Sequence, residues 1–229
     1  MAGETGGATR KVGLDDVMHD EEIRTYILTS DRYLGAIGFT EHGLRHVGLV
    51  SRNARRILLE LGHPEREAEL AGIAGYLHDI GNMVSRDHHG QTGAVIAWNL
   101  LRRMGMDPEE TARVVAAIGN HEEEYGNSVN VTAAALVIAD KADAHYKRVR
   151  NREVATFDIH DRVNYAVRDA VVDVDAANRR IDLRLEIDTA IASVAEYFEI
   201  FLVRMMMSRR AANFLDCEFA LNINDRRVL

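Results

Sequence analysis

The sequence predicts a mainly α-helical domain followed by a small α+β segment. Apolar residues recur at helical spacing through most of residues 40–148. Proline occurs only at positions 64 and 108, so few helices are interrupted. After residue 150 the pattern changes to an alternation of apolar and polar residues, which is typical of strands. We therefore expect a compact helical bundle with a C-terminal β-hairpin and one long helix.

Five stretches of the first part predict helices. In the first of them Val50, Ile57 and Leu61 share one face, and His46 lies four residues before Val50 on the same face. Pro64 and Pro108 each precede an acidic run, which suits the first turn of a helix. The expected helices cover residues 40–61, 65–79, 88–104, 108–120 and 129–148.

The last part of the chain predicts strands and a helix. Ile181, Leu183 and Leu185 alternate with polar residues, and residues 176–178 separate this run from an earlier one, as in a hairpin. A final helix is expected over residues 189–215. The predicted organisation is a flexible N-terminal tail over 1–12, a helical domain over 13–150 and an α+β segment over 151–229. This last segment is a candidate homodimer interface, with a monomer as the alternative.

Composition excludes several classes of protein. The net charge of −8 argues against an extended nucleic-acid surface, which needs many phosphate contacts from lysine and arginine. The single Cys217 excludes a disulfide framework and fits a reducing compartment. No apolar run approaches the ~20 residues of a membrane span, and the N-terminus carries no secretion signal. We expect a cytoplasmic protein without membrane contact.

Several polar residues occupy positions where the helical pattern predicts burial. His46 lies on an apolar face, His78 and Asp79 end an apolar helix, and Asp140 follows "AAALVIA". A buried carboxylate without a partner is costly, so each needs a cation or a hydrogen bond. Imidazole together with carboxylate suits Fe, Mn or Zn better than calcium, which prefers oxygen alone.

This arrangement resembles the H…HD…D signature of the HD-domain metal-dependent phosphohydrolases, over roughly residues 38–150. "HHGQTGA" is similar to the H-x-x-x-G-A element of the two-metal members and aligns His89, and "AAIGNHEEEYG" aligns His121. "VIADKADAH" is similar to their closing A-D motif. The resemblance implies an HD helical bundle with two metal sites that share Asp79. The implied ligands are His46, His78, Asp79 and Asp140 for one ion, and Asp79, His89 and His121 for the other.

The resemblance also implies an enzyme that hydrolyses the phosphoric ester of a nucleotide or other small phosphorylated metabolite through a metal-activated water. Two divalent transition-metal ions are expected, Fe or Mn first, with Zn, Ni, Co or Mg as alternatives. The implied catalytic residues are Asp79, Asp140 and Lys141. The candidate substrate contacts are Asn82, Arg86, Lys141 and His145. Many relatives carry lysine near the motif, whereas "HDIGN" places Asn82 at one such position, so Arg86 or Lys141 would supply the missing charge.

Some alternatives stay open at the level of sequence. His42 competes with His46, and His88 with His89, for the same ligand positions. For Glu122, Glu123 and Glu124 we expect a solvated cluster, the alternative being a carboxylate that orients a ligand. Two other functions compete with hydrolysis: a di-iron oxygenase of the HD type and a non-catalytic nucleotide sensor.

Overall fold

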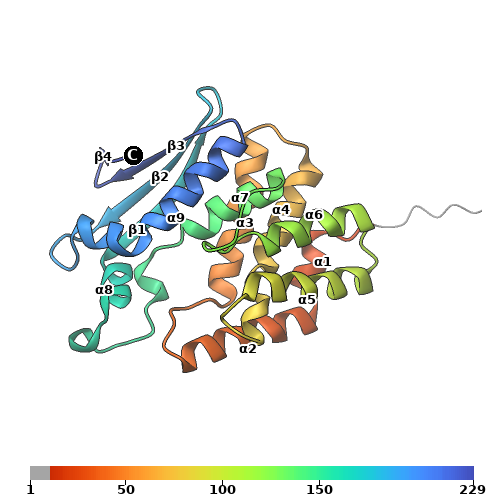
Figure 1. Ribbon diagram of the computed structural model, residues 1–229, viewed down its shortest axis with the longest axis horizontal. Coiled ribbons are helices and arrows are strands. Elements are labelled where there is room, and N and C mark those ends of the chain that lie inside the picture. Colours follow the sequence, from red (N-terminus) through yellow and green to blue (C-terminus); the bar gives the residue numbers. More distant parts are fainter. Residues whose placement is uncertain (1–10) are drawn as a thin grey trace, which may run out of the picture.

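The computed structural model describes residues 11–229. The tail predicted over residues 1–12 lies outside this range except for its last two residues, of which Val12 is buried. The mainly α-helical class with a small C-terminal α+β part is confirmed (Figure 1). The helices are α1 (Leu14–Met18), α2 (Glu21–Ala36), α3 (Leu44–Glu60), α4 (Glu65–Leu77), α5 (His89–Met104), α6 (Pro108–Gly119), α7 (Val131–Lys141), α8 (Ile159–Ala166) and α9 (Val194–Phe214). Short 3₁₀ turns are η1 (Ile80–Met83), η2 (Tyr146–Arg148) and η3 (Val154–Thr156).

Helices α3, α4 and α7 pack against one another and form the centre of the helical domain. Gly75 lets α3 and α4 approach closely, because an added Cβ there would lie 2.8 Å from Ser51 Cα. Helix α7 is almost entirely buried, as its run of alanine, leucine and valine predicts. Helices α2 and α5 flank η1 and so enclose the segment that follows α4 (Figure 1).

The predicted helix over residues 129–148 is too long. Asn130 caps the helix by accepting a hydrogen bond from Ala133 N, and the helix ends at Lys141. The chain then turns because Asp143 points inward, where it contacts Arg45 and His46 instead of continuing the helical face. The remaining residues form η2, and Arg148 Nη1 secures this segment by donating to Asp143 O over 2.7 Å.

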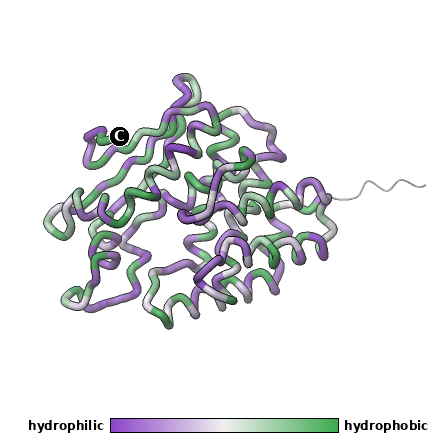
Figure 2. Tube along the Cα trace, viewed as in Figure 1, coloured by the Kyte–Doolittle hydropathy of each residue, from purple (hydrophilic) through white to green (hydrophobic). Residues whose placement is uncertain are grey.

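The C-terminal part forms a four-stranded sheet of β1 (Val167–Asp175), β2 (Arg180–Ile187), β3 (Glu218–Ile223) and β4 (Arg226–Arg227). The predicted hairpin corresponds to β1 and β2, which pair antiparallel. Strand β3 lies parallel to β2, and α9 forms the crossover between them. Figure 2 shows the alternation of hydrophobic and hydrophilic residues along these strands. Helix α9 packs on β3 and on α7, so it joins the sheet to the helical domain (Figure 1).

The predicted start of the final helix, at residue 189, is also too early. Ser193 and Glu196 form a capping box that begins α9 at Val194, because Ser193 Oγ accepts from Glu196 N and the Glu196 side chain accepts from Ser193 N. Helices α1, α2 and α8 and strands β3 and β4 were not predicted. Asp20 and Asp158 cap the N-termini of α2 and α8. An aspartate at a helix start is the sequence feature from which these two helices could have been predicted. Within residues 11–229 no helix is long and apolar enough to cross a membrane.

Candidate metal centre

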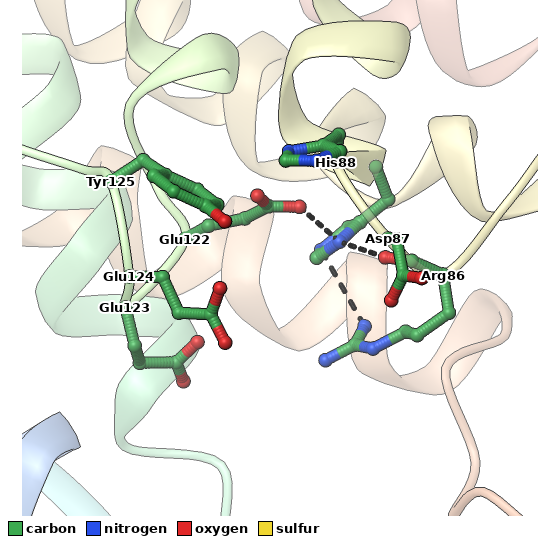
Figure 3. Close-up of a pocket in the computed structure, with 8 residues that line it drawn as sticks. Arg86, Asp87, His88, Glu122, Glu123, Glu124 and Tyr125 are labelled. Carbon is green, nitrogen blue, oxygen red and sulfur yellow. Dashed lines mark hydrogen bonds and ion pairs between the residues drawn. The ribbon is translucent and has the colours of Figure 1, made fainter.

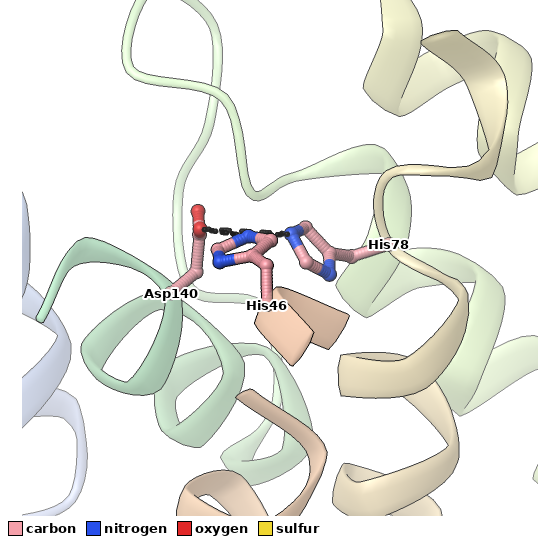
Figure 4. A group of neighbouring side chains, drawn as sticks. All are labelled: His46, His78 and Asp140. Carbon is pink, nitrogen blue, oxygen red and sulfur yellow. Dashed lines mark hydrogen bonds and ion pairs between the residues drawn. The ribbon is translucent and has the colours of Figure 1, made fainter. Parts of the chain in front are cut away.

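The first group of side chains comes from three helices of the central domain. His46 lies in the first turn of α3, His78 directly follows α4, and Asp140 lies one residue before the end of α7. Nε2 of His46 lies 3.2 Å from Nε2 of His78 and 3.3 Å from Oδ1 of Asp140. All three side chains are buried and point toward one another (Figure 4). The packing of α3, α4 and α7 therefore brings together ligand atoms from distant parts of the sequence.

Asp79 connects this group to a second one. It follows His78 and directly precedes η1, and only 4% of it is exposed. Its Oδ2 atom lies 3.5 Å from Nε2 of His46 and 3.4 Å from Nε2 of His78. Its other oxygen, Oδ1, lies 3.3 Å from Nε2 of His89. The two oxygens of one carboxylate thus face two different sets of histidines.

The second set consists of His89 and His121. His89 is the first residue of α5, and His121 follows the C-terminal cap of α6. Their Nε2 atoms lie 3.1 Å apart, and Nε2 of His121 lies 3.9 Å from Oδ1 of Asp79. Both residues are buried. The structure thus brings together all six residues that the sequence suggested as ligands.

The hydrogen bonds of the rings direct their lone pairs into the centre. In His78, His89 and His121 the Nδ1 atom lies within hydrogen-bond distance of a backbone carbonyl, at 2.9, 3.0 and 2.7 Å respectively. A carbonyl oxygen only accepts, so Nδ1 carries the hydrogen and Nε2 of a neutral ring carries the lone pair. Facing Nε2 lone pairs at 3.1–3.2 Å repel unless a proton or a metal ion lies between them.

The spacing of these atoms fits divalent metal ions. Metal bonds to histidine nitrogen or carboxylate oxygen measure about 2.0–2.2 Å, which places adjacent ligands about 3.0 Å apart in an octahedron and about 3.4 Å apart in a tetrahedron. Most of the observed separations, 3.2–3.5 Å in the first group, fall in this range. Oδ2 of Asp79 is buried and has no hydrogen-bond partner among the described residues. A cation would satisfy this oxygen, so the residues present fit the metal ions that the resemblance implies.

The protonation of the centre shows the same need for positive charge. Burial opposes the charging of His78, but Asp79 and Asp140 raise its pKa to about 10. Burial, together with the charge of His78, lowers the pKa of His121 to about 3. Burial alone would raise the pKa of Asp140, yet Lys141 and His78 hold it well below its ordinary value. One proton on His78 offsets only one of the two carboxylate charges, Lys141 pairs with Asp140, and a bound cation would displace the proton on His78.

Two carboxylates behind the ligands were not assigned from the sequence. Asp143 lies 2.7 Å from Nδ1 of His46, and Glu122 contacts Nδ1 of His89. The expected solvated cluster is therefore wrong for Glu122, which is buried and also accepts a hydrogen bond from Gly90 N over 2.8 Å. Such carboxylates orient a histidine ligand and increase its basicity. Asp143 lies three residues after Asp140, and this spacing is the sequence feature that could have placed it near the ligands.

The structure separates the four suggested substrate contacts. Asn82 Nδ2 donates to Oδ1 of Asp79 over 2.9 Å, so this amide supports a carboxylate. Nζ of Lys141 lies between two carboxylates, 2.7 Å from Oδ2 of Asp140 and 3.1 Å from Oε1 of Glu123. Unlike Asn82 and Lys141, His145 does not contact the ligand cluster among the described residues. Its ring stacks on Tyr146 instead.

Arg86 is the cation best placed for an anionic ligand. Its Nη1 atom lies 3.5 Å from Nε2 of His89 and donates to Oδ1 of Asn82 over 3.3 Å. Within residues 11–229 no carboxylate forms an ion pair with it. It lines a cavity of about 320 Å³ together with His89 and Glu122–Tyr125. Figure 3 shows Arg86 across this cavity from Glu123 and Glu124.

The competing histidines point elsewhere. His42 is buried, but its Nδ1 atom bonds to Thr40 O over 2.7 Å and its ring packs on the edge of His46, with the centroids 5.4 Å apart. His88 adopts a left-handed backbone with φ of 56°, and its ring packs at a tilt against that of Tyr125. This turn directs His88 outward and the next residue, His89, inward.

Comparison with known proteins identifies the family. The family model of the HD domain matches residues 43–166. The uncharacterized protein MJ1020 of Methanocaldococcus jannaschii is 26% identical over 61% of this chain, and ribonuclease Y of Cutibacterium acnes is 30% identical over 60% of it. The matched region spans 62% of the archaeal protein and 23% of ribonuclease Y.

Among solved structures, the chain resembles one described as a predicted HD superfamily hydrolase, from an uncultured Thermotogales bacterium. The TM-score is 0.44 at 28% identity, and the match covers 58% of this chain and 75% of the other. The HD family model covers more than half of the described chain and contains all six converging side chains. The chain therefore belongs to the HD domain family.

Proposed function

We propose that this chain is a metal-dependent phosphohydrolase that hydrolyses an ester of a small phosphorylated metabolite or nucleotide. The observation that carries the proposal is Asp79, whose two oxygens face two separate sets of ligand atoms. His46, His78, Asp79 and Asp140 would hold one divalent ion, and Asp79, His89 and His121 a second. Iron or manganese suits this mixture of imidazole and carboxylate. Bound ions of this kind lower the pKa of a coordinated water and neutralise charge on a phosphoryl group.

The residues of the chain account for the rest of the reaction. Arg86 binds the phosphoryl oxygens, since its guanidinium lies beside His89 and has no carboxylate partner in residues 11–229. Asp140 stays ionised and accepts a hydrogen bond from the attacking water, because Lys141 holds its carboxylate in place over 2.7 Å. Hydrolysis forms one bond from water oxygen to phosphorus and breaks the bond from phosphorus to the leaving oxygen. The attacking water loses a proton and the leaving oxygen takes one up. Water itself is the nucleophile, so no serine or cysteine is needed.

The relatives leave the type of ester open. Ribonuclease Y carries in its name an action on RNA, which is a phosphodiester, and this supports testing diesters as well as monoesters. The net charge of −8 favours a small substrate over a long polyanion.

The test is metal analysis of the purified protein, followed by phosphate release and diester cleavage over nucleotides and sugar phosphates with Mn²⁺ or Fe²⁺. We expect turnover that requires metal and that Asp79→Asn abolishes, while Asp216→Asn, at an exposed carboxylate after α9, retains it. Turnover that stops without dioxygen would instead indicate an oxygenase. Tight nucleotide binding without turnover in the metal-loaded protein would indicate a sensor.

A further inference from the structure

A second cavity, of about 430 Å³, adjoins the candidate metal centre from the side of the C-terminal segment. Its wall includes residues of the 37–42 loop, α8 and α9. This volume lies within the range of small-molecule sites, which measure roughly 300–1,000 Å³. The cavity shares Arg86 with the cavity shown in Figure 3.

Two residues of its wall contact histidines of the metal centre, and a third is linked to the centre through Glu123 and Lys141. Arg86 approaches His89, as described above. His42 packs its ring against His46. Nε of Arg204 forms an ion pair with Oε1 of Glu123 over 3.0 Å, and the same oxygen lies 3.1 Å from Nζ of Lys141. A ligand whose reacting group lies at the metal centre would therefore extend into this cavity.

Three guanidinium groups, of Arg86, Arg148 and Arg204, line this one cavity. Its two carboxylates are engaged elsewhere: Asp158 caps α8 and Asp161 accepts from Asn151 over 3.4 Å. Within the described part of the chain, neither carboxylate forms an ion pair with the three arginines. Burial lowers the pKa of Arg148; its ion pair with Asp143 opposes this shift, and the charge of Arg204 adds to it. Like charges gathered in one partly enclosed space favour an anion between them.

Arg204 is held in a conformation that leaves hydrogen-bond donors free. Its guanidinium lies over the ring of Phe201, with 4.8 Å between the carbon and the ring centroid. Its Nε atom forms an ion pair with Glu123, and its Nη1 and Nη2 atoms have no hydrogen-bond partner in residues 11–229, so both can donate to a ligand. Asn164, also in the wall, is 4% exposed, and its Oδ1 atom has no partner among the described residues.

We propose that this cavity binds the leaving group of the substrate, that this group carries a second phosphate, and that Arg204 is the residue that selects for it. The inference rests on the proposed phosphohydrolase function. The phosphoryl group that is cleaved lies beside Arg86, and the second phosphate accepts hydrogen bonds from Arg204 and Arg148 inside the cavity. A guanidinium pairs with two oxygens of a phosphate at once, which suits this role better than lysine. Arg204 comes from α9, outside the residues that the HD family model matches.

The experiment compares matched pairs of esters: fructose 1,6-bisphosphate with fructose 6-phosphate, and adenosine 3′,5′-bisphosphate with adenosine 5′-monophosphate. In the wild type we expect kcat/KM to be about tenfold or more higher for the bisphosphate of a pair, as one charge-assisted hydrogen-bonded pair supplies. Arg204→Gln should bring this ratio close to one, and Arg204→Lys should retain part of it. Arg209→Gln, at an exposed arginine on the same helix, is the matched control and should keep the wild-type ratio. Circular dichroism checks that each variant is folded.

A wild-type ratio near one, or an unchanged ratio in Arg204→Gln, overturns the inference while the hydrolase function stands. If no ester is hydrolysed with any metal, the proposed function has failed, and calorimetry then decides the inference separately. It measures the affinity of the metal-loaded protein for adenosine 3′,5′-bisphosphate, which should weaken about tenfold in Arg204→Gln. Equal affinities in the wild type and this variant would reject a phosphate-binding role for Arg204.

Discussion

Nδ1 of His46 lies 2.7 Å from Oδ2 of Asp143, and both side chains are almost completely buried. The same carboxylate accepts a hydrogen bond from Arg45 Nη2 over 2.8 Å. Asp143 therefore holds the ring of His46 with Nε2 toward His78 and Asp140. This contact ties the end of α7 to the start of α3 and sets the geometry of the first ligand group.

Replacing Asp143 by Asn should weaken metal binding about 10- to 100-fold, because the ring of His46 loses an ionised partner that fixes its orientation. Calorimetric titration with Mn²⁺ measures the affinity of both proteins for the metal. Asp216→Asn serves as the control for a neutralised carboxylate outside the site. Equal affinities in the wild type and Asp143→Asn would show that the carboxylate does not support a ligand.

Removal of metal should destabilise the fold. The ligand side chains come from α3, α5, α7 and the ends of α4 and α6. A bound ion would therefore link helices that are otherwise held together by side-chain packing. Free metal at about 100 times its Kd stabilises the folded state by about 2.7 kcal/mol. For a chain of this size that is a rise in Tm of roughly 5–10 °C. Thermal unfolding after treatment with a chelator, and again after Mn²⁺ is restored, measures it, and an unchanged Tm would argue against an ion held by these residues.

Arg86→Ala should lower kcat/KM about 10²- to 10³-fold, as expected when a charged donor to the phosphoryl group is lost. Arg86→Lys should restore part of the rate because the charge remains. Arg32→Ala, at an exposed arginine of α2 that lies over Tyr33, is the matched control. Steady-state kinetics at saturating metal measure kcat/KM of each variant. A wild-type value in Arg86→Ala would show that Arg86 does not bind the phosphoryl group.

Gly81→Ala should disrupt the second ligand group. An added Cβ at this position would lie 2.5 Å from Gly93 N and closer still to His89 O, so η1 and the start of α5 would have to separate. Overpacking of this kind costs about 1–3 kcal/mol or more, and the displaced His89 should lower the metal content as well. Gly119→Ala is the control, since its Cβ would meet Ala94 Cβ at an ordinary 3.6 Å. Urea unfolding and metal analysis test both variants, and wild-type values in Gly81→Ala would contradict the close packing.

The capping box of α9 should make stability depend on pH. Hydrogen bonds from Ser193, together with Arg162, lower the pKa of Glu196 from 4.5 to about 2 in the folded protein. The folded state therefore binds fewer protons than the unfolded state, and the contribution of Glu196 is complete above about pH 4.5 and disappears as the pH falls toward 2. Glu196→Gln should lower Tm at pH 7, and the difference from the wild type should shrink below pH 4.5.

Glu199→Gln, on an exposed face of the same helix, is the control and should match the wild type throughout. Thermal unfolding between pH 7 and the lowest pH at which the protein stays folded provides the comparison. A difference that grows toward low pH would show the opposite linkage.

The sequence by itself determined the helical class, the hairpin and the spacing of the six residues that converge. These features depend on local patterns: apolar residues at helical intervals, alternation in strands, and polar residues at the ends of apolar runs. Periodicity says little about where an element ends, so the helix predicted to reach residue 148 stops at Lys141. Its end is decided by the contact of Asp143 with His46 and Arg45, which are distant in sequence.

Only the tertiary structure decided which atoms meet. The left-handed backbone of His88 turns His89 inward, and neighbouring histidines cannot be distinguished by composition. Glu122 could be placed behind His89, and Arg204 beside Glu123, only after α5, α6 and α9 had packed together. A local pattern shows that a polar residue lies on a buried face. Which partner it meets there depends on contacts between elements far apart along the chain, and the packing of the helices alone creates these contacts.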